Sequence, residues 1–530
     1  MFGFLDRVRL VKRGLACSKQ RHKPTRIESM RRLDADFRLK IGIFGVLGAE
    51  LTLLIASAHH PNPAKYILIS LFILATAIGQ LWINHPDTFR RNSRVALVFG
   101  LIFIHLATAR LIMELSARLG GASREFGLLL IPFALTPIVL SVLLGNNLGI
   151  YGAIFVSLWT SILFRGIDAV LLITSLLTGF IAVFATIQVR RRSRLIRAGV
   201  YVGLATWVLG MSFGIITVPR FPIGMADWAF FNQSVIVILS GVVSGMVVDA
   251  ALPMLEGLFQ ITTDMSWLEI ADRNHPLLVR LRLEAPGTWN HSETVADLAE
   301  VAADRIGANG TMCRACAYFH DIGKLVKPNY FSENIVGDEN PHDHLVPTMS
   351  ALIIMAHVKE GVDLALKYRL NARIIDVIQQ HHGTSLVGYF YKRALQQQQD
   401  AREAGKIMNI RKEDIPEVRE ESFRYSGPKP QFKESGIISL ADAAESASRS
   451  LEKPTPQEIE RLVNEIISKR VAGGQVDECD LTLRELRQIA ESFRLTLQGA
   501  LHRRVKYPKD EEKNEQDARR LRHLPPASAA

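Results

Sequence analysis

The sequence contains little cysteine, with four residues in a chain of 530, at positions 17, 313, 316 and 479. So few cysteines cannot form the dense disulfide framework of small secreted domains, so nothing here requires an oxidising compartment. Cys313 and Cys316 form a lone C-x-x-C pair, whereas a structural zinc site needs four ligands and no second pair exists. We therefore expect these two residues to be small apolar members of a core helix.

Charge is scarce between residues 41 and 252, where long apolar runs follow one another, and mixed composition begins only at about residue 255. The net charge of +11 would suit a nucleic-acid binder, but the basic residues crowd into residues 7–40 and into loops between the apolar runs. This distribution is typical of membrane topology. It predicts a lipid bilayer as a partner and argues against a nucleic acid polymer.

A hydrocarbon core about 30 Å thick requires roughly 20 helical residues. Eight segments approach that length: 41–58, 66–83, 95–113, 127–145, 147–164, 169–189, 198–218 and 234–252. Only Asn146 and Asn147 mark the boundary between the fourth and fifth, so a re-entrant hairpin would leave a similar pattern. Arginines gather in loops 84–94 and 190–197. Because positive loops stay inside, eight spans predict a multi-pass protein of the cell (inner) membrane with a cytoplasmic N-terminus and C-terminal half.

The spans carry few polar groups that would indicate transport. They include no arginine-rich span, no paired acid and base and no repeated broken helix, which favours a sensor or an anchor. Glu50 lies near the middle of the first span, where an ionised carboxylate is costly. We expect it to be neutral and hydrogen-bonded inside the bundle, with a functional role as the alternative, and His105 to be structural. The charged residues 1–40 predict no cleaved signal peptide.

The C-terminal half has almost no β-alternation, and apolar residues recur there every three and four positions, which predicts an all-α domain. Thr288 or Asn290 is expected to cap its first helix, which reaches Ile306. Further helices are expected at 311–322, 346–358, 371–382, 384–402, 436–451, 456–471 and 480–502. Residues 403–435 are interpreted as a loop or lid. We divide the chain into a basic segment 1–40, a bundle 41–252, a helical domain 253–508 and a disordered tail 509–530.

Seven potential metal ligands are concentrated in short motifs of this half: His291, His320, Asp321, His357, His381, His382 and Asp442. Imidazoles and carboxylates are ligands that Mn, Fe and Zn accept, and an aspartate directly after a histidine can bridge two ions. Two ions about 3.5–4 Å apart can hydrolyse phosphoesters by activating a water and neutralising phosphoryl charge.

The neighbours of these ligands carry further expectations. Adjacent His381 and His382 suit a helix end, with Gly383 as the stop signal. Lys324 can offer positive charge to a phosphate oxygen, with a solvent-exposed lysine as the equal alternative. His275, His342 and His344 lie outside the pattern and are interpreted as loop or packing residues.

At these residues the sequence resembles the PgpH-type cyclic di-AMP phosphodiesterases, which are membrane proteins of the 7TM-HD family. The resemblance runs from about Pro253 to Pro508 and includes the stretches 274–278, 283–288, 350–354 and 477–483. It implies a membrane bundle followed by an HD phosphohydrolase domain, Mn or Fe as the two divalent ions, and the seven residues above as ligands. Asp321 would bridge the ions, with His291, His320 and Asp442 on one and His357, His381 and His382 on the other.

Three departures from the family pattern stand out. Trp289 replaces a tyrosine of the family, residues 396–420 resemble an insertion, and only residues 59–65 join the first two spans where family members often carry a large extracellular domain. The signal sensed by such a domain therefore cannot be sensed in the same way here.

The leading hypothesis is a metal-dependent phosphodiesterase that opens cyclic di-AMP to the linear dinucleotide pApA, with Asp321 and Lys324 as catalytic residues. Cyclic di-GMP is a less favoured substrate, because the Gly-Tyr-Pro signature of the HD-GYP group does not follow His382. A membrane receptor or scaffold that binds a cyclic dinucleotide without turnover is the hypothesis from another class. The sequence leaves a homo-oligomer open.

Overall fold

The computed structural model describes residues 34–58, 62–119, 124–164, 169–187, 189–216, 218, 227–335, 337, 340–407, 417–451 and 455–502. The described residues form helices, with one isolated antiparallel bridge between Leu386 and Arg424, so the predicted all-α fold class is confirmed. The chain divides into two compact units, Met1–Met265 and Ser266–Ala530. Most of the predicted basic segment, up to residue 33, and the predicted tail lie outside the described residues.

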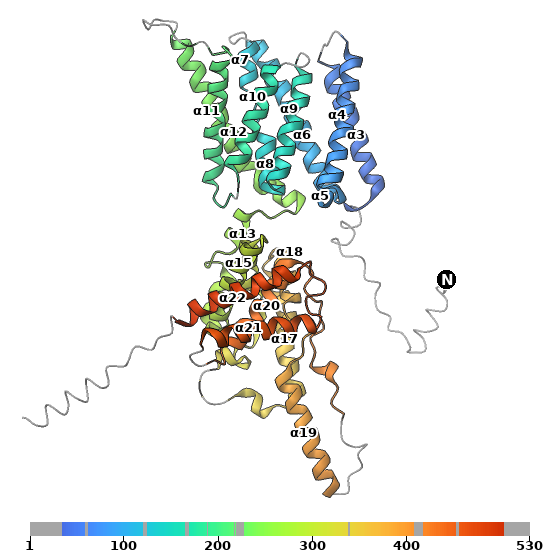
Figure 1. Ribbon diagram of the computed structural model, residues 1–530, viewed down its shortest axis with the longest axis vertical. Helices are drawn as coiled ribbons and strands as arrows, with labels where there is room; N and C mark the ends of the chain where they lie inside the picture. Colours follow the sequence, from blue (N-terminus) through green and yellow to red (C-terminus); the bar gives the residue numbers. More distant parts are fainter. Residues whose placement is uncertain are drawn as a thin grey trace, which may run out of the picture. The chain divides into compact units, whose positions relative to one another are not determined.

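The first unit is a bundle of apolar helices, many of which run side by side (Figure 1). In chain order they are α3 (Phe37–Ala56), α4 (Pro63–Asn84), α5 (Pro86–Arg90), α6 (Asn92–Leu119), α7 (Arg124–Leu129), α8 (Leu135–Leu144), α9 (Asn146–Leu163), α10 (Ala169–Ala185), α11 (Ser193–Ser212) and α12 (Asp227–Phe259). Among the described residues, α3, α4, α6, α11 and α12 are long and apolar enough to cross a membrane. This unit therefore makes the chain a membrane protein.

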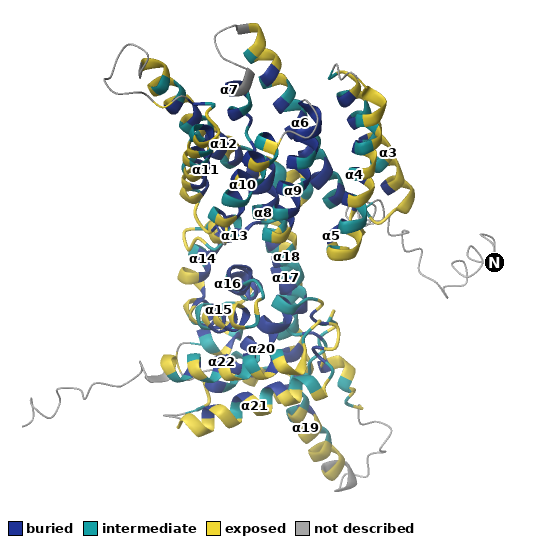
Figure 2. Ribbon diagram, turned by 45° about the horizontal axis from the view of Figure 1, so that its top comes forward, coloured by how far each residue is buried: buried dark blue, intermediate teal, exposed yellow. Residues whose placement is uncertain are grey.

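Burial in this unit follows the position of each helix. Side chains of α8 and α9 are mostly buried, whereas α3 and α4 expose large apolar side chains such as Leu53, Phe72 and Trp82 (Figure 2). Exposed apolar surface of this extent would be unfavourable in water. In a bilayer the same surface faces acyl chains.

The predicted span 127–145 is not one continuous helix. Instead α7 ends at Leu129 and α8 begins at Leu135, with irregular backbone between them. Pro132 lies in this break, and proline removes a backbone donor and clashes with the preceding turn, which explains the interruption. Gly145, at φ +100°, then turns the chain from α8 directly into α9. The expectation of eight uninterrupted spans is therefore wrong at this position.

The two polar residues singled out in the spans have different surroundings. Glu50 is half-buried in an otherwise largely apolar pocket of about 440 Å³ between α3 and α6. Among the described residues it has no hydrogen-bond partner, and its expected hydrogen bond inside the bundle stays a prediction. His105 is buried against Phe133, with ring centroids 6.1 Å apart. Its location in the core agrees with a structural role.

The second unit is a helical domain whose helices enclose one continuous apolar core. Its elements are α13 (Asp264–Ile270, whose first residues belong to the first unit), α14 (Pro276–Glu284), α15 (Pro286–Ile306), α16 (Gly310–Phe319), η1 (Ile322–Val326), η2 (Pro328–Tyr330), η3 (Ser332–Asn334), η4 (Pro341–His344), α17 (Pro347–Lys367), α18 (Ala372–Gln380), α19 (Gly388–Ile407), η6 (Glu420–Phe423), α20 (Lys433–Ser448), α21 (Pro456–Ala472) and α22 (Leu483–His502). Cys313 and Cys316 are both fully buried in the core, as expected for small apolar residues.

The start of α15 differs from the prediction. The helix begins at Pro286, so Thr288 and Asn290 lie inside it and neither caps it. Proline is favoured at the first helical position because its missing N–H would have no partner there. Thr288 is instead buried, and its side chain contacts the segment at Glu333 and Asn334. Trp289 stacks on Tyr318 of α16, with ring centroids 5.6 Å apart.

Candidate metal centre

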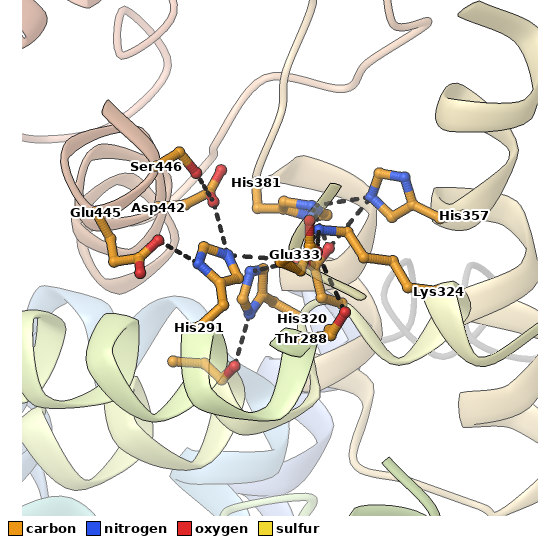
Figure 3. Close-up of polar contacts among 12 residues, drawn as sticks. Thr288, His291, His320, Lys324, Glu333, His357, His381, Asp442, Glu445 and Ser446 are labelled. Atoms are coloured by element: carbon orange, nitrogen blue, oxygen red, sulfur yellow. Dashed lines mark hydrogen bonds and ion pairs between the residues drawn. The ribbon is translucent and has the colours of Figure 1, made fainter. Parts of the chain in front are cut away.

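The seven predicted ligands come from five helices or helix ends that converge in the second unit. Figure 3 labels five of them, His291, His320, His357, His381 and Asp442. His291 lies on α15, His357 on α17 and Asp442 on α20. His320 and Asp321 follow α16 directly, and His381 and His382 follow α18. The predicted helix end before the histidine pair is confirmed, because α18 stops at Gln380 and Gly383 adopts φ +54°.

Two glycines let the supporting segments approach the site. A Cβ atom on Gly323 would lie 1.8 Å from the His357 carbonyl oxygen, so only glycine allows η1 to pack against α17 there. A Cβ atom on Gly287 would lie 1.8 Å from the Glu333 carbonyl oxygen. These contacts bring Asp321 next to His357 and bring Glu333 next to the start of α15.

The ligand atoms form two groups, each within 4.8 Å: His291, His320 and Asp442 in one, and Asp321, His357, His381 and His382 in the other. Asp321 contacts both groups. Its Oδ2 lies 3.4 Å from His291 Nε2 and 3.3 Å from His320 Nε2. Its Oδ1 lies 3.4 Å from His357 Nε2 and 3.6 Å from His381 Nε2. The two oxygens of one carboxylate therefore face two separate sets of imidazoles.

Three of the histidines are oriented by backbone carbonyls. Nδ1 of His320 donates to the Ala317 carbonyl at 2.6 Å, Nδ1 of His357 to Ile354 at 2.5 Å, and Nδ1 of His381 to Ile378 at 2.9 Å. With the proton on Nδ1, each ring presents the lone pair of Nε2 to the centre. This arrangement is typical of metal-ligating histidines.

The polar atoms at the centre fit a bound cation. His320 Nε2 and Asp321 Oδ1 are buried and lack hydrogen-bond partners, and His357 Nε2 lies only 3.3 Å from His381 Nε2. Lone pairs that face one another in a buried site repel unless a cation lies between them. Two donor atoms, each about 2.1 Å from one metal ion, lie roughly 3.0–3.4 Å apart. The observed separations match this geometry closely, so the residues present can hold divalent metal ions.

The ionisation of four of the seven ligands also favours metal binding. Burial alone would raise the pKa of Asp321, but the Lys324 ammonium and His320 hold it well below its usual range. The pKa of Asp442 is likewise low, because contacts with His291 and His382 outweigh the effect of burial. Burial lowers the pKa of His357 to about 4 and also lowers that of His382. At His291 burial favours the neutral ring, but the hydrogen bonds to Asp442 and Glu445 outweigh it and raise the pKa to about 9, so this imidazole loses a proton when it binds a metal. The ionised carboxylates and the neutral rings of His357 and His382 are already in the forms that bind metals.

Lys324 is not a surface lysine. Its side chain is only 12% exposed, and its ammonium lies 2.8 Å from Asp321 Oδ2 and 2.6 Å from Glu333 Oε1. Glu333 in turn accepts a hydrogen bond from the Thr288 hydroxyl at 3.2 Å. The lysine is therefore held beside the centre by two carboxylates.

Two further carboxylates that the motifs did not predict contact residues of the site. Glu333 orients Lys324, and Glu445 accepts a hydrogen bond from His291 Nδ1 at 2.5 Å. The Arg449 guanidinium holds the other oxygen of Glu445 at 2.8 Å. Glu445 follows Asp442 by three residues on α20, a spacing that places both carboxylates on one helix face and could have indicated it. Nothing in the sequence near Glu333 gives such a signal.

The remaining histidines lie outside both groups, as predicted. His275 caps α14, where its Nδ1 accepts a hydrogen bond from the Leu277 N–H at 3.2 Å. His342 is buried beside Tyr330, and its Nε2 lies 2.8 Å from the Tyr330 carbonyl oxygen. The structure places His344 in η4.

A helical domain with this histidine and aspartate constellation, preceded by an apolar helical bundle, defines a membrane-bound HD-domain protein. Residues 63–263 match the family described as "7TM receptor with intracellular HD hydrolase", and residues 288–447, which include all seven predicted ligands, match the HD domain. HD domains bind divalent metals, in agreement with the geometry of the centre.

The chain is also similar to individual proteins. The chain is 32% identical over 464 residues to the cyclic-di-AMP phosphodiesterase PgpH of Bacillus subtilis, covering 87% of this chain and 62% of that protein. It is 36% identical over 456 residues to PgpH of Listeria monocytogenes, covering 84% and 60% respectively. The crystal structure of the L. monocytogenes PgpH HD domain in complex with cyclic-di-AMP covers 43% of this chain and 99% of that chain, at 41% identity and a TM-score of 0.38.

The predicted resemblance to the PgpH-type family is therefore confirmed. The chain spans about three fifths of the length of these two relatives.

Proposed function

We propose that this protein is a membrane-bound, metal-dependent phosphodiesterase that hydrolyses cyclic di-AMP to pApA. The observation that carries the proposal is the position of Asp321, whose two oxygens face two buried groups of ligands. The names of the PgpH relatives supply the substrate. The alternative of a receptor without turnover would be favoured by lost ligands, whereas here all seven positions carry a ligand side chain.

We propose that the site holds two metal ions, which are Mn or Fe. His291, His320 and Asp442 would hold one, His357, His381 and His382 the other, and Asp321 both. When bound, such a pair supplies an activated water and neutralises charge on phosphoryl oxygens. The helices around the site exclude bulk water, since six of the seven ligands are buried and His382 is half-buried.

Besides the metal ions, we propose that the side chain of Lys324 supplies a positive charge that faces the phosphate. Its ammonium remains protonated, because Asp321 and Glu333 outweigh the effect of burial and raise its pKa. A fixed positive charge beside the reacting phosphate stabilises the charge that builds up on its oxygens. Glu333 would act by holding the lysine in place.

The proposed location is the cell membrane, with the N-terminus and the HD domain in the cytoplasm. The arginines at 190–194 support it, because positive loops resist translocation. Reporter fusions after Arg197 and after Gln260 test it and should both report the cytoplasm. Opposite sidedness of the two fusions would contradict the proposed topology.

The activity is tested with the full-length chain purified in detergent, loaded with Mn²⁺ or Fe²⁺ and supplied with a panel of cyclic dinucleotides. Product chromatography should show pApA from cyclic di-AMP and slower turnover of cyclic di-GMP. Lys324→Gln should lower kcat by at least about tenfold while metal content is unchanged. Lys327→Gln, which removes a charge one turn further along, is the matched control. A metal-loaded protein that binds cyclic di-AMP without cleaving it would favour the receptor hypothesis.

A further inference from the structure

Arg470 is a cation near the C-terminal end of α21, which packs against the loop that follows the ligand His382, and the proposed chemistry has not used it. The end of α21 is fixed against the loop that begins at Gly383, directly after the ligand His382. Gln475 N–H donates to the Arg470 carbonyl at 3.0 Å, and Gln475 Oε1 accepts from the Thr384 N–H at 2.9 Å. A Cβ atom on Gly383 would lie 2.5 Å from the same Gln475 oxygen. The segment that carries Arg470 is therefore packed directly against the two residues that follow His382.

The guanidinium of Arg470 is not satisfied within the described chain. Its Nη1 atom is buried without a hydrogen-bond partner, and the side chain forms no ion pair with a described residue. Burial lowers the pKa of Arg470, and the groups that oppose this effect are Asp442 and Tyr425, which both border the metal centre. Burying an unpaired cation costs free energy that a bound anion can offset.

Tyr425 packs against two of the proposed metal ligands. Its ring lies 4.3 Å from the ring of the ligand His382 and 6.1 Å from that of His357. Its N–H donates to the Ser385 carbonyl at 3.0 Å, which fixes the segment over the same loop. The Tyr425 hydroxyl has no hydrogen-bond partner among the described residues. An unpartnered hydroxyl thus lies on a residue packed against His382, and the end of α21, which carries Arg470, packs against the residues that follow His382.

We infer that Arg470 and the Tyr425 hydroxyl form a second phosphate subsite, which binds the phosphodiester of the cyclic dinucleotide that is not being cleaved. The inference rests on the proposed function. A cyclic dinucleotide carries two phosphodiesters in one ring, so when one lies at the metal centre the other lies a short distance away. Lys324 is already engaged by two carboxylates, whereas Arg470 has free donors. The planar fork of a guanidinium matches two phosphate oxygens.

The subsite predicts a dependence on the second phosphate of the substrate. Bis(p-nitrophenyl) phosphate carries a single phosphodiester and needs only the metal centre. Arg470→Gln in the full-length, Mn²⁺-loaded chain should raise KM for cyclic di-AMP roughly 10- to 100-fold, the range expected for a charge-assisted hydrogen bond. The kinetic constants for bis(p-nitrophenyl) phosphate should stay within about twofold. Lys469→Gln, on the neighbouring exposed residue, is the matched charge control and should leave both substrates unchanged.

The outcomes separate this inference from the proposed function. An unchanged KM for cyclic di-AMP in Arg470→Gln would overturn the subsite, and so would an equal loss with both substrates, which would mean that Arg470 acts through Asp442. Absence of any cyclic dinucleotide hydrolysis by the unaltered chain would overturn the proposed function instead. If Arg470→Gln loses its metal or unfolds, Arg470→Lys keeps the charge but not the fork. It should still raise KM for cyclic di-AMP several-fold, and a KM equal to that of the unaltered chain would overturn the inference.

Discussion

Replacing Asp321 by asparagine should empty both proposed metal positions, because one carboxylate serves both. The substitution keeps the shape of the side chain but removes its charge and converts one oxygen into an NH₂ group, which cannot bind a cation. Whichever way the amide is turned, one ligand group loses its oxygen and the other keeps only a neutral carbonyl. Lys324 remains paired with Glu333 at 2.6 Å, so the metal-free variant should still fold.

The size of the effect follows from linkage. Each ion bound at a free concentration of 100 times its Kd stabilises the folded chain by about 2.7 kcal/mol, so two ions contribute about 5 kcal/mol. For a domain of this size that corresponds to a rise in Tm of roughly 10–20 °C on addition of Mn²⁺. Asp321→Asn should lose most of this rise. Asp442→Asn, which alters one group only, should keep about half of it.

The assay combines metal analysis of the dialysed protein with thermal unfolding at matched free Mn²⁺. We expect two ions per unaltered chain, about one in Asp442→Asn and nearly none in Asp321→Asn, with cyclic di-AMP turnover abolished in the last. Asp343→Asn is the control for the loss of one carboxylate. Its side chain is 63% exposed and belongs to neither ligand group. Retention of two ions in Asp321→Asn, or identical losses in the two ligand variants, would refute the argument that Asp321 is shared.

Three further predictions follow from the surroundings of the site. Gly323→Ala should cost about 1–3 kcal/mol of stability and lower activity more than tenfold, because the new methyl group overlaps the His357 carbonyl. The control is Gly388→Ala, whose Cβ meets no atom within 4 Å and which should be neutral in unfolding and turnover assays. Glu445→Gln should weaken Mn²⁺ binding in titrations by about 10- to 100-fold, since His291 loses a charged acceptor, and unchanged affinity would argue against this role. The pKa of Glu485 is lowered to about 2 by hydrogen bonds from Lys433 and from Thr482, so its ionised form stabilises the fold above pH 4.5 and this contribution is lost as the pH falls toward 2. Glu485→Gln should thus cost about 1 kcal/mol at neutral pH and flatten that acid limb of the unfolding curve, and an unaltered limb would contradict the assignment.

Much of the architecture was predictable because it depends on local patterns. Apolar runs of nearly 20 residues specify membrane helices through the thickness of the bilayer, and three- and four-residue periodicity specifies the helices of the second unit. The pattern failed where a single residue changes the backbone. Pro132 divides the predicted span 127–145, and Pro286 starts α15 before its predicted caps.

The sequence by itself determined which side chains can bind metal, because the ability to bind metal depends on the residue type. The motifs around His320 and His381 contain the imidazoles and the carboxylate that have this ability. Only the tertiary structure decided how these residues combine. His291 and Glu445 are 154 positions apart, and Gln475, which follows α21, accepts a hydrogen bond from Thr384 in the loop after His382. No local spacing encodes such contacts, because they arise when α15, α20 and α21 pack around one core. The buried state of Lys324 has the same origin, since it depends on Glu333 being brought beside it by the close approach at Gly287.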